Sequence, residues 1–256
     1  MAKIKKGKSL CIFSAKGGVG KTITTLNLAG VIAAMDKKVL IIDLDLIGGG
    51  IAVALNRASE KNIFTLYEDL KQNRYDELNS YVTVYNERIH FIASPKDPRQ
   101  ATKIDARYIE SIIDNASFLY DVILIDTNHF LSDLNLLTLD TVDSILFVAT
   151  NDPLDIKNLK SLLSIFKDLE INKFKIMLNN SRDPFKQFFN AVDIANILKA
   201  NIDYVISENM FVKNIDTYVM NGQILTTISN MPTAFAKDYA TLTTVITDVL
   251  ESGVKQ

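Results

Sequence analysis

The strongest constraint on the fold of this chain is a glycine-rich run near its N-terminus, Ser14-Ala15-Lys16-Gly17-Gly18-Val19-Gly20-Lys21-Thr22. An apolar run, residues 10–13, precedes it, and residues 23–29 follow with the apolar spacing of a helix. A strand, a glycine-rich turn and a helix in this order are the context of a phosphate-binding loop. In such a loop, backbone N–H groups and the positive end of the helix dipole face the phosphates. The run therefore predicts an α/β fold with a phosphate site at this loop.

Two side chains in the loop carry the chemistry that the motif requires. Lys21 would reach the β- and γ-phosphates of a nucleotide, and the Thr22 hydroxyl would coordinate Mg²⁺. The backbone that would surround the phosphates is that of Gly17, Gly18, Val19 and Gly20. The alternative is a plain glycine-rich turn with surface lysines, and the strand–helix context makes it the weaker interpretation.

The loop departs from the plain phosphate-loop motif at two positions. Ala15 replaces the first glycine, and a second lysine, Lys16, stands at the head of the loop. The run from Lys16 to Thr22 resembles the deviant Walker A motif of the MinD/ParA group of P-loop ATPases. The resemblance implies a magnesium-dependent ATPase that forms a homodimer when ATP is bound. It also implies that Lys16 reaches across the dimer to the phosphates of the partner subunit.

Two further apolar runs end in aspartates. Residues 39–42 lead to Asp43 and Asp45, and residues 122–125 lead to Asp126. The carboxyl ends of parallel strands are where ligands bind in open α/β sheets, so these carboxylates are expected beside the loop. The resemblance implies that Asp126 holds Mg²⁺, that Asp43 supports the Mg²⁺ shell or hydrogen-bonds nearby, and that Asp45 orients the attacking water. Ordinary turn chemistry is the alternative for the first two aspartates.

A later strand, residues 173–178, ends at Asn179-Asn180-Ser181. The resemblance implies that Asn179 hydrogen-bonds the adenine edge and that residues 207–212 line the base, whereas a turn-forming asparagine pair is the alternative. After Asp126 the chain continues Thr127-Asn128-His129, where the family commonly has proline and glycine. We expect His129 to be an ordinary loop residue rather than a catalytic one.

Strand and helix patterns alternate from end to end, which predicts a mostly parallel twisted sheet with helices on both faces. Among the expected helices are residues 64–70, 104–116 and 185–198, together with a final helix whose apolar stripe faces the core. We expect residues 9–256 to form a single P-loop domain, preceded by a flexible tail of residues 1–8.

Composition excludes several other classes of protein. The formal net charge is −2 and the pI is about 5.8, whereas a protein whose main task is nucleic-acid binding usually carries a basic surplus. Cys11 is the only cysteine, so an internal disulfide and a cysteine-held iron–sulfur cluster are both excluded, and a cytoplasmic location is expected. No apolar run approaches the roughly 20 residues of a membrane-spanning helix.

A finer resemblance, spread over most of the chain, is to the CpaE/TadZ-type ATPases of pilus assembly and polar localisation. It is carried by Leu44-Asp45-Leu46 with residues 51–55, by Ala93-Ser94-Pro95, by Tyr120-Asp121-Val122 and by Leu178-Asn179. It implies an ATP-driven dimerisation switch that positions a pilus or secretion apparatus. An unidentified protein partner or activator would recruit it to a cell pole or to the inner face of the membrane.

Two alternatives stay open at this point. One is a ParA-type partition ATPase that binds DNA as a dimer. The other is a nucleotide-bound polarity scaffold that does not hydrolyse ATP, which the unusual segment after Asp126 would allow. Composition itself indicates neither DNA binding nor peripheral membrane binding.

Overall fold

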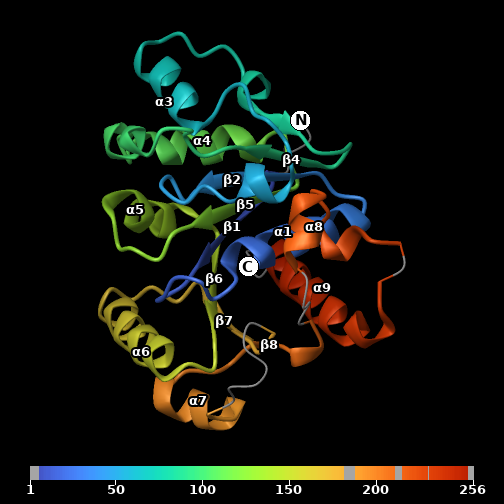
Figure 1. The fold of residues 1–256 in the computed structure, drawn as a ribbon. Helices are drawn as coiled ribbons and strands as arrows, with labels where there is room; N and C mark the ends of the chain where they lie inside the picture. The colour runs from blue at the N-terminus through green and yellow to red at the C-terminus, as the bar shows by residue number, and fades with distance from the viewer. Residues whose placement is uncertain (1–5, 182–187, 211–214, 230, 253–256) are drawn as a thin grey trace.

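The computed structural model describes residues 6–181, 188–210, 215–229 and 231–252. These residues contain an eight-stranded sheet with the strand order β3-β4-β2-β5-β1-β6-β7-β8. Neighbouring strands run parallel except for β3 and β4, which are antiparallel. The predicted fold class, a mostly parallel sheet with helices on both faces, is confirmed (Figure 1).

The strands are β1 (Lys8–Phe13), β2 (Val39–Leu44), β3 (Thr83–Val84), β4 (Ile89–Ile92), β5 (Val122–Thr127), β6 (Ser144–Ala149), β7 (Phe174–Asn179) and β8 (Tyr204–Ile206). The helices are α1 (Lys21–Ala34), α2 (Ile51–Ala54), α3 (Ile63–Lys71), α4 (Tyr108–Ser117), α5 (Asp133–Thr141), α6 (Pro153–Asp168), α7 (Ala191–Leu198), α8 (Ile215–Met220) and α9 (Ala236–Glu251). None of the described helices is long and apolar enough to cross a membrane.

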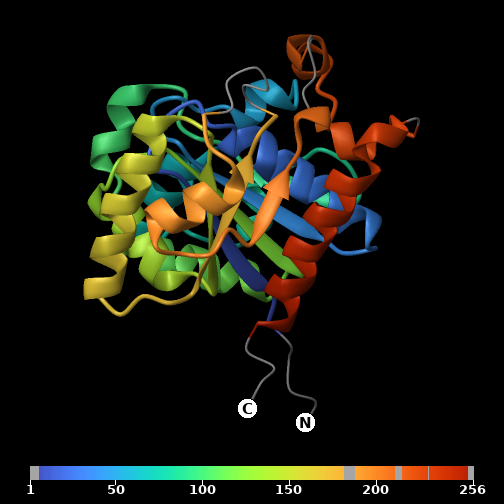
Figure 2. The ribbon, with the colours of Figure 1, turned by 90° about the horizontal axis from the view of Figure 1, so that it is seen from below.

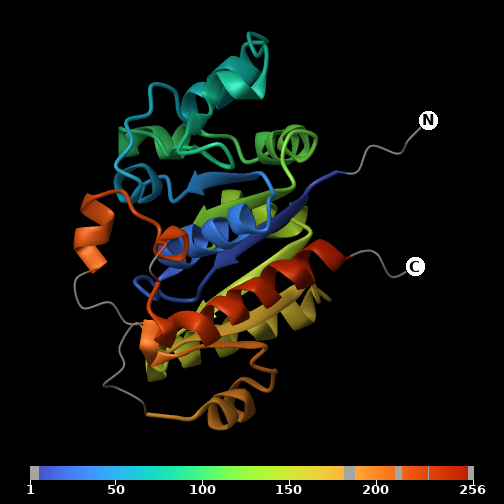
Figure 3. The same cartoon turned by 90° about the vertical axis from the view of Figure 1, so that its right-hand side faces the viewer.

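The central strands are apolar on both faces because helices cover both sides of the sheet. Successive side chains of β1 alternate between two cores: Cys11 and Phe13 enter one, and Leu10 and Ile12 enter the other. Helices α4, α5 and α6 cover the first core, and α1 and α9 cover the second (Figure 2). Helices α1 and α9 pack side by side (Figure 3), so the apolar stripe of the final helix faces the core as expected.

The helix expected over residues 104–116 begins only at Tyr108. A 3₁₀ helix (Pro98–Lys103) comes first, and Asp97 caps it by accepting the N–H of Arg99 at 2.9 Å. Asp105 then accepts the N–H of the residue two positions later, at 3.0 Å. Such local side-chain bonds compete with the helix, and they delay its start by one turn.

Two helices further along also differ from the sequence expectation. The helix expected over residues 185–198 begins at Ala191, where Asn190 and Asp193 accept each other's backbone N–H groups in a capping box. Residues 182–187 lie outside the described part of the chain. Helix α5 was not expected, because its sequence lacks a clear apolar stripe; Ser132 caps it by accepting the N–H of Asn135.

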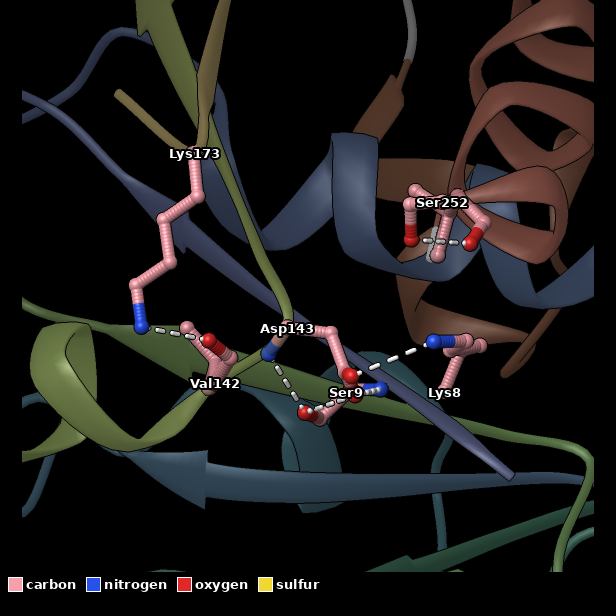
Figure 4. Close-up of polar contacts among 7 residues, drawn as sticks. Lys8, Ser9, Val142, Asp143, Lys173 and Ser252 are labelled. Atoms are coloured by element: carbon pink, nitrogen blue, oxygen red, sulfur yellow. Dashed lines mark hydrogen bonds and ion pairs between the residues drawn. The ribbon is translucent and has the colours of Figure 1, made fainter. Parts of the chain in front are cut away.

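A carboxylate ties together the edge of the sheet at which the central strands begin. Asp143 accepts hydrogen bonds from the N–H and the hydroxyl of Ser9, both at 2.8 Å, and pairs with Lys8 at 3.3 Å (Figure 4). Lys173 donates to the carbonyl of Val142 at 2.7 Å in the same region. Strand β1 thus begins at the last residue of the expected tail, while residues 1–5 lie outside the described chain.

Candidate functional site

The strand order brings the predicted site residues to one edge of the sheet. Strands β2, β5, β1, β6 and β7 are consecutive parallel neighbours, so their carboxyl ends lie side by side. The glycine-rich loop follows β1, and Asp43, Asp126 and Asn179 lie at the ends of β2, β5 and β7. Residues far apart in the sequence therefore meet around the loop.

Gly20 closes the loop and begins helix α1. Its φ of 102° lies in the left-handed region, and a Cβ at this position would be only 2.7 Å from Nδ2 of Asn179. Only glycine meets both conditions without strain. Val19 is buried and anchors the loop, whereas Gly17 and Gly18 are exposed. The loop therefore presents its backbone to solvent at the N-terminus of a helix, which is the arrangement that binds an anion.

Lys21 is a buried cation at the base of the loop. Its amine donates to the hydroxyl of Ser14 at 2.8 Å, and that hydroxyl donates to the carbonyl of Lys16 at 2.7 Å. Burial lowers the pKa of Lys21, while the negative charges of Asp126 and Asp45 raise it. A partly desolvated lysine beside exposed loop amides suits a phosphate group.

Asp126 is completely buried and accepts two hydroxyl hydrogen bonds. Thr22 donates to its Oδ2 at 2.7 Å, and Thr25 donates to its Oδ1 at 3.1 Å. Burial raises the pKa of Asp126 to about 6, against the opposing effects of the hydroxyls and of Lys21. The two residues predicted as metal ligands, Thr22 and Asp126, are thus in direct contact.

The second hydroxyl that binds Asp126 comes from Thr25 of helix α1, and not from the residue that directly follows Thr22. The residue at that position is Ile23. The side chain of Ile23 is aliphatic and half-buried, so it can neither donate a hydrogen bond to a phosphate nor coordinate a metal ion. The hydroxyl donors of α1 at this site are therefore three residues apart, on one side of the helix.

Asp43 lies opposite Asp126 in the register of β2 and β5 and is also completely buried. Burial and the charge of Asp126 raise the pKa of Asp43. Its two oxygens accept the N–H groups of Asp45 and Ile51, each at 3.1 Å, so it shapes the segment between β2 and α2. Two buried carboxylates beside a threonine hydroxyl form a set of hard oxygen donors, which fits Mg²⁺.

Asp45 is half-buried at the start of the turn that follows β2. Its Oδ1 accepts the N–H of Gly48 at 3.0 Å, and its carbonyl accepts the N–H of Gly49 at 2.8 Å. The charge of Asp45 raises the pKa of both Lys21 and His129. The structure therefore places this carboxylate near the loop lysine, and its role toward water stays a prediction.

Lys16 has a partner within its own chain. Its amine lies 3.1 Å from Oδ1 of Asp152, and both side chains are partly exposed. Asp152 is the N-cap of α6, and the same oxygen accepts the N–H groups of Leu154 and Asp155 at 3.0 Å. Nothing in the sequence links Asp152 to Lys16, so only the structure identifies this pair.

Asn179 holds the loop itself. Its Nδ2 donates to the carbonyl of Val19 at 3.0 Å, and its Oδ1 accepts from the N–H and the hydroxyl of Ser181. The next residue, Asn180, lines a cavity of about 580 Å³ beside the loop. Its Oδ1 is buried and has no hydrogen-bond partner among the described residues. Asn180 thus offers a hydrogen-bond acceptor beside the loop, whereas its sequence suggested only a turn.

His129 lies in the loop after β5, as expected, but it faces the glycine-rich loop. A Cβ on Gly17 would be 3.2 Å from its ring, which packs on the ring of Phe130 with centroids 4.1 Å apart. Burial and the charge of Lys21 lower the pKa of His129. The imidazole therefore lies against the glycine-rich loop at Gly17. Residues 207–210 are described, but the rest of the predicted base-lining loop lies outside the described chain.

A family model described as an AAA domain, AAA_31, matches residues 7–181, which carry the loop together with Asp43, Asp45 and Asp126. The chain belongs to the MinD/ParA group of P-loop ATPases. The septum site-determining protein MinD of Synechocystis is 23% identical over 192 residues, covering 74% of this chain and 70% of the relative. The chromosome partitioning protein ParA of Myxococcus xanthus is 37% identical over 68 residues, covering 27% of this chain and about a quarter (24%) of the relative.

Solved structures of this group share the fold. The septum site-determining protein MinD from Pyrococcus horikoshii, complexed with Mg-ADP, matches with a TM-score of 0.77 and 19% identity. The match covers 98% of this chain and 99% of that chain. At this identity the likeness establishes the arrangement of the sheet and helices, and the resemblance drawn from the glycine-rich loop is confirmed at the level of the family.

The buried charge of Asp126 predicts a pH-dependent stability. The pKa is higher in the folded protein than in the unfolded chain, so the folded state binds more protons between about pH 4 and pH 6, and its stability falls as pH rises through this window. In the absence of ligands, Asp126→Asn should therefore be more stable than the native chain near pH 7, by about 1–3 kcal/mol, and equally stable near pH 4. Urea unfolding from pH 4 to pH 8 measures this. A difference that does not change with pH would contradict the prediction, and exposed Asp168→Asn serves as the control.

The contacts of Asn179 predict how its loss changes ligand binding. Asn179→Ala removes the donor that holds the carbonyl of Val19, so the loop should bind all phosphate chains more weakly. We expect affinities for ATP, GTP and tripolyphosphate to fall together, by about tenfold, in isothermal titration calorimetry. Selective loss of ATP binding would instead show that Asn179 acts on the adenine base.

Proposed function

We propose that this chain binds ATP with Mg²⁺ at the glycine-rich loop, hydrolyses it slowly and uses the ATP-bound state to form a homodimer. The observation that carries the proposal is the contact of Thr22 with Asp126 directly beside the buried amine of Lys21. A buried cation and an oxygen donor set at the N-terminus of α1 suit a phosphate chain and its metal ion. The Mg-ADP complex of the Pyrococcus relative supports the same ligand class.

Each group has a distinct task in this chemistry. Lys21 and the loop amides stabilise the charge that develops on the transferred phosphoryl group. Thr22 would hold Mg²⁺, with Asp126 behind it and Asp43 supporting the shell, and the ion would neutralise charge on the β- and γ-phosphates. Asp45 would orient the attacking water from the turn after β2. Asn179 keeps the loop in shape by holding the carbonyl of Val19.

Lys16 would link ATP binding to dimerisation by leaving Asp152 of its own chain and binding the phosphates held by the partner subunit. In the structure it pairs with Asp152, and the pair is partly exposed. An exposed ion pair contributes only about 0.2–1 kcal/mol, so Lys16 can leave Asp152 at little cost when a phosphate chain of the partner subunit becomes available. Asp152 keeps its task as the cap of α6, because two backbone N–H groups already bind it.

The biological task that fits such a dimer is spatial positioning. The two relatives named above carry names that describe septum placement and chromosome partitioning. By the resemblance to the CpaE/TadZ type, we propose a pilus or secretion apparatus as the positioned object. The protein would be cytoplasmic and would be recruited by a protein partner to a pole or to the inner face of the membrane.

Lys16→Ala tests the dimer. We expect this variant to bind ATP as a monomer and to lose ATP-dependent dimerisation, because its cation no longer reaches the second subunit. Sedimentation velocity with and without ATP and Mg²⁺ measures the change. Lys160→Ala, which removes an exposed lysine of α6, should dimerise normally. An unaltered ATP-dependent dimer of the Lys16 variant would remove Lys16 from the proposal.

Asp45→Asn tests the role of this residue toward water. The asparagine Oδ1 can still accept the N–H of Gly48, so the turn is kept while the charge is lost. We expect turnover to fall at least tenfold and the ATP-bound dimer to accumulate, and Asp45→Ala should behave alike. Phosphate release and sedimentation measure the two effects. Turnover at the native rate in both variants would exclude Asp45 from the chemistry.

A further inference from the structure

A groove of about 620 Å³ lies between helix α5 and the segment that precedes α4, away from the glycine-rich loop. Helix α5 packs against α4, the helix that follows this segment (Figure 1). Apolar side chains line it together with charged ones, which are mostly acidic. The lining residues are Ile104, Asp105, Ala106, Arg107, Asp133, Leu134, Leu136, Leu137 and Asp140.

Helix α5 presents an ordered stripe to this groove. Asp133 and Asp140 are seven residues apart, which places them on the same side of the helix about 10 Å from each other. Leu136 and Leu137 lie between them, and Leu136 is 43% exposed. The groove therefore offers an apolar centre with a carboxylate at each end.

The carboxylates of the stripe are available to a partner. Neither Asp133 nor Asp140 has an ion-pair partner within 4.0 Å among the described residues. Lys173 lies near Asp140, but its amine donates to the backbone carbonyls of Asp140 and Val142. On the opposite wall, Asp105 is already bound by Arg107. Among the described residues, the surface thus carries a carboxylate without an ion pair at each end of α5, and the charge of Lys173 offsets part of that of Asp140.

The groove is connected to the nucleotide site through the chain. Helix α5 begins directly after the loop that contains His129, and Phe130 and Leu131 of that loop are 57% and 45% exposed. Asp126, at the start of the same connection, contacts Thr22. A ligand bound to α5 would therefore lie next to residues 127–132, the segment that connects Asp126 to α5.

We propose that this groove docks a basic amphipathic helix of a partner protein. Such a helix would place leucine-like side chains on Leu136 and Leu137 and a lysine or arginine, seven residues apart, at Asp133 and Asp140. The acidic ends disfavour nucleic acid and anionic membranes, both of which carry the same sign of charge.

A second copy of this chain is a poorer occupant. Helix α6 is the described α-helix with lysines at the required spacing, Lys160 and Lys167. The apolar residue between them, Leu163, is buried in the core of its own subunit. That helix cannot present the apolar centre that the groove requires.

The test uses the full chain and two synthetic 15-residue peptides labelled with fluorescein. The first has lysines seven residues apart flanking two leucines on an alanine and glutamine background, and the second has glutamates in place of the lysines. Fluorescence anisotropy at low ionic strength should show at least tenfold tighter binding of the lysine peptide, and this preference should weaken as salt is added. Equal binding of the two peptides would overturn the proposal.

Variants of the chain locate the binding. Asp140→Lys should weaken binding of the lysine peptide about tenfold and Leu136→Ser should weaken it further, while Asp168→Lys on α6 should have no effect. Native thermal unfolding and native ATP affinity in Asp140→Lys would exclude misfolding as the cause. Unchanged peptide binding in Asp140→Lys and Leu136→Ser, or sedimentation showing that Leu136 holds two copies of this chain together, would overturn the proposal. Peptide binding is measured without ATP hydrolysis. A negative result for the docking site would therefore leave the proposed ATPase switch untouched, and the reverse also holds.

Discussion

Two buried carboxylates, Asp43 and Asp126, face each other across β2 and β5, and the rest of the site is arranged around them. Burial of negative charge without full compensation is unfavourable, and the raised pKa of each group reflects this. Hydroxyls of Thr22 and Thr25, two backbone N–H groups and the nearby charge of Lys21 offset only part of it. The site therefore carries an electrostatic imbalance that a divalent cation with its phosphate ligand would relieve.

The groups around these aspartates are occupied by partners within the chain. Ser14 binds the amine of Lys21, Asp152 binds Lys16, and Asn179 holds the carbonyl of Val19. These contacts tie the loop and its lysines to the rest of the chain, and two of them involve lysines that a phosphate would attract. A phosphate ligand that binds more tightly once Lys16 and Lys21 have left Asp152 and Ser14 shifts the population toward that state. This shift is the physical basis of the proposed switch.

Much of the fold followed from local patterns. Buried parallel strands are continuous apolar runs, so the expected positions of β1, β2, β5 and β7 lie close to their actual ones. Helix starts were less predictable. Side chains such as Asp105 and Asn190 bond to nearby backbone and decide where a helix begins, and α5 lacks the apolar stripe by which a helix is recognised in sequence.

The sequence by itself determined the phosphate loop, the family and the side chains at the strand ends, because glycine geometry and strand periodicity are local properties of a chain. Only the tertiary structure decided which of these side chains contact one another. The Thr22–Asp126 contact, the Lys16–Asp152 pair and the bond from Asn179 to the loop depend on the order of strands in the sheet. The same holds for the groove beside α5, since its two walls are brought together by packing and share no pattern in the sequence.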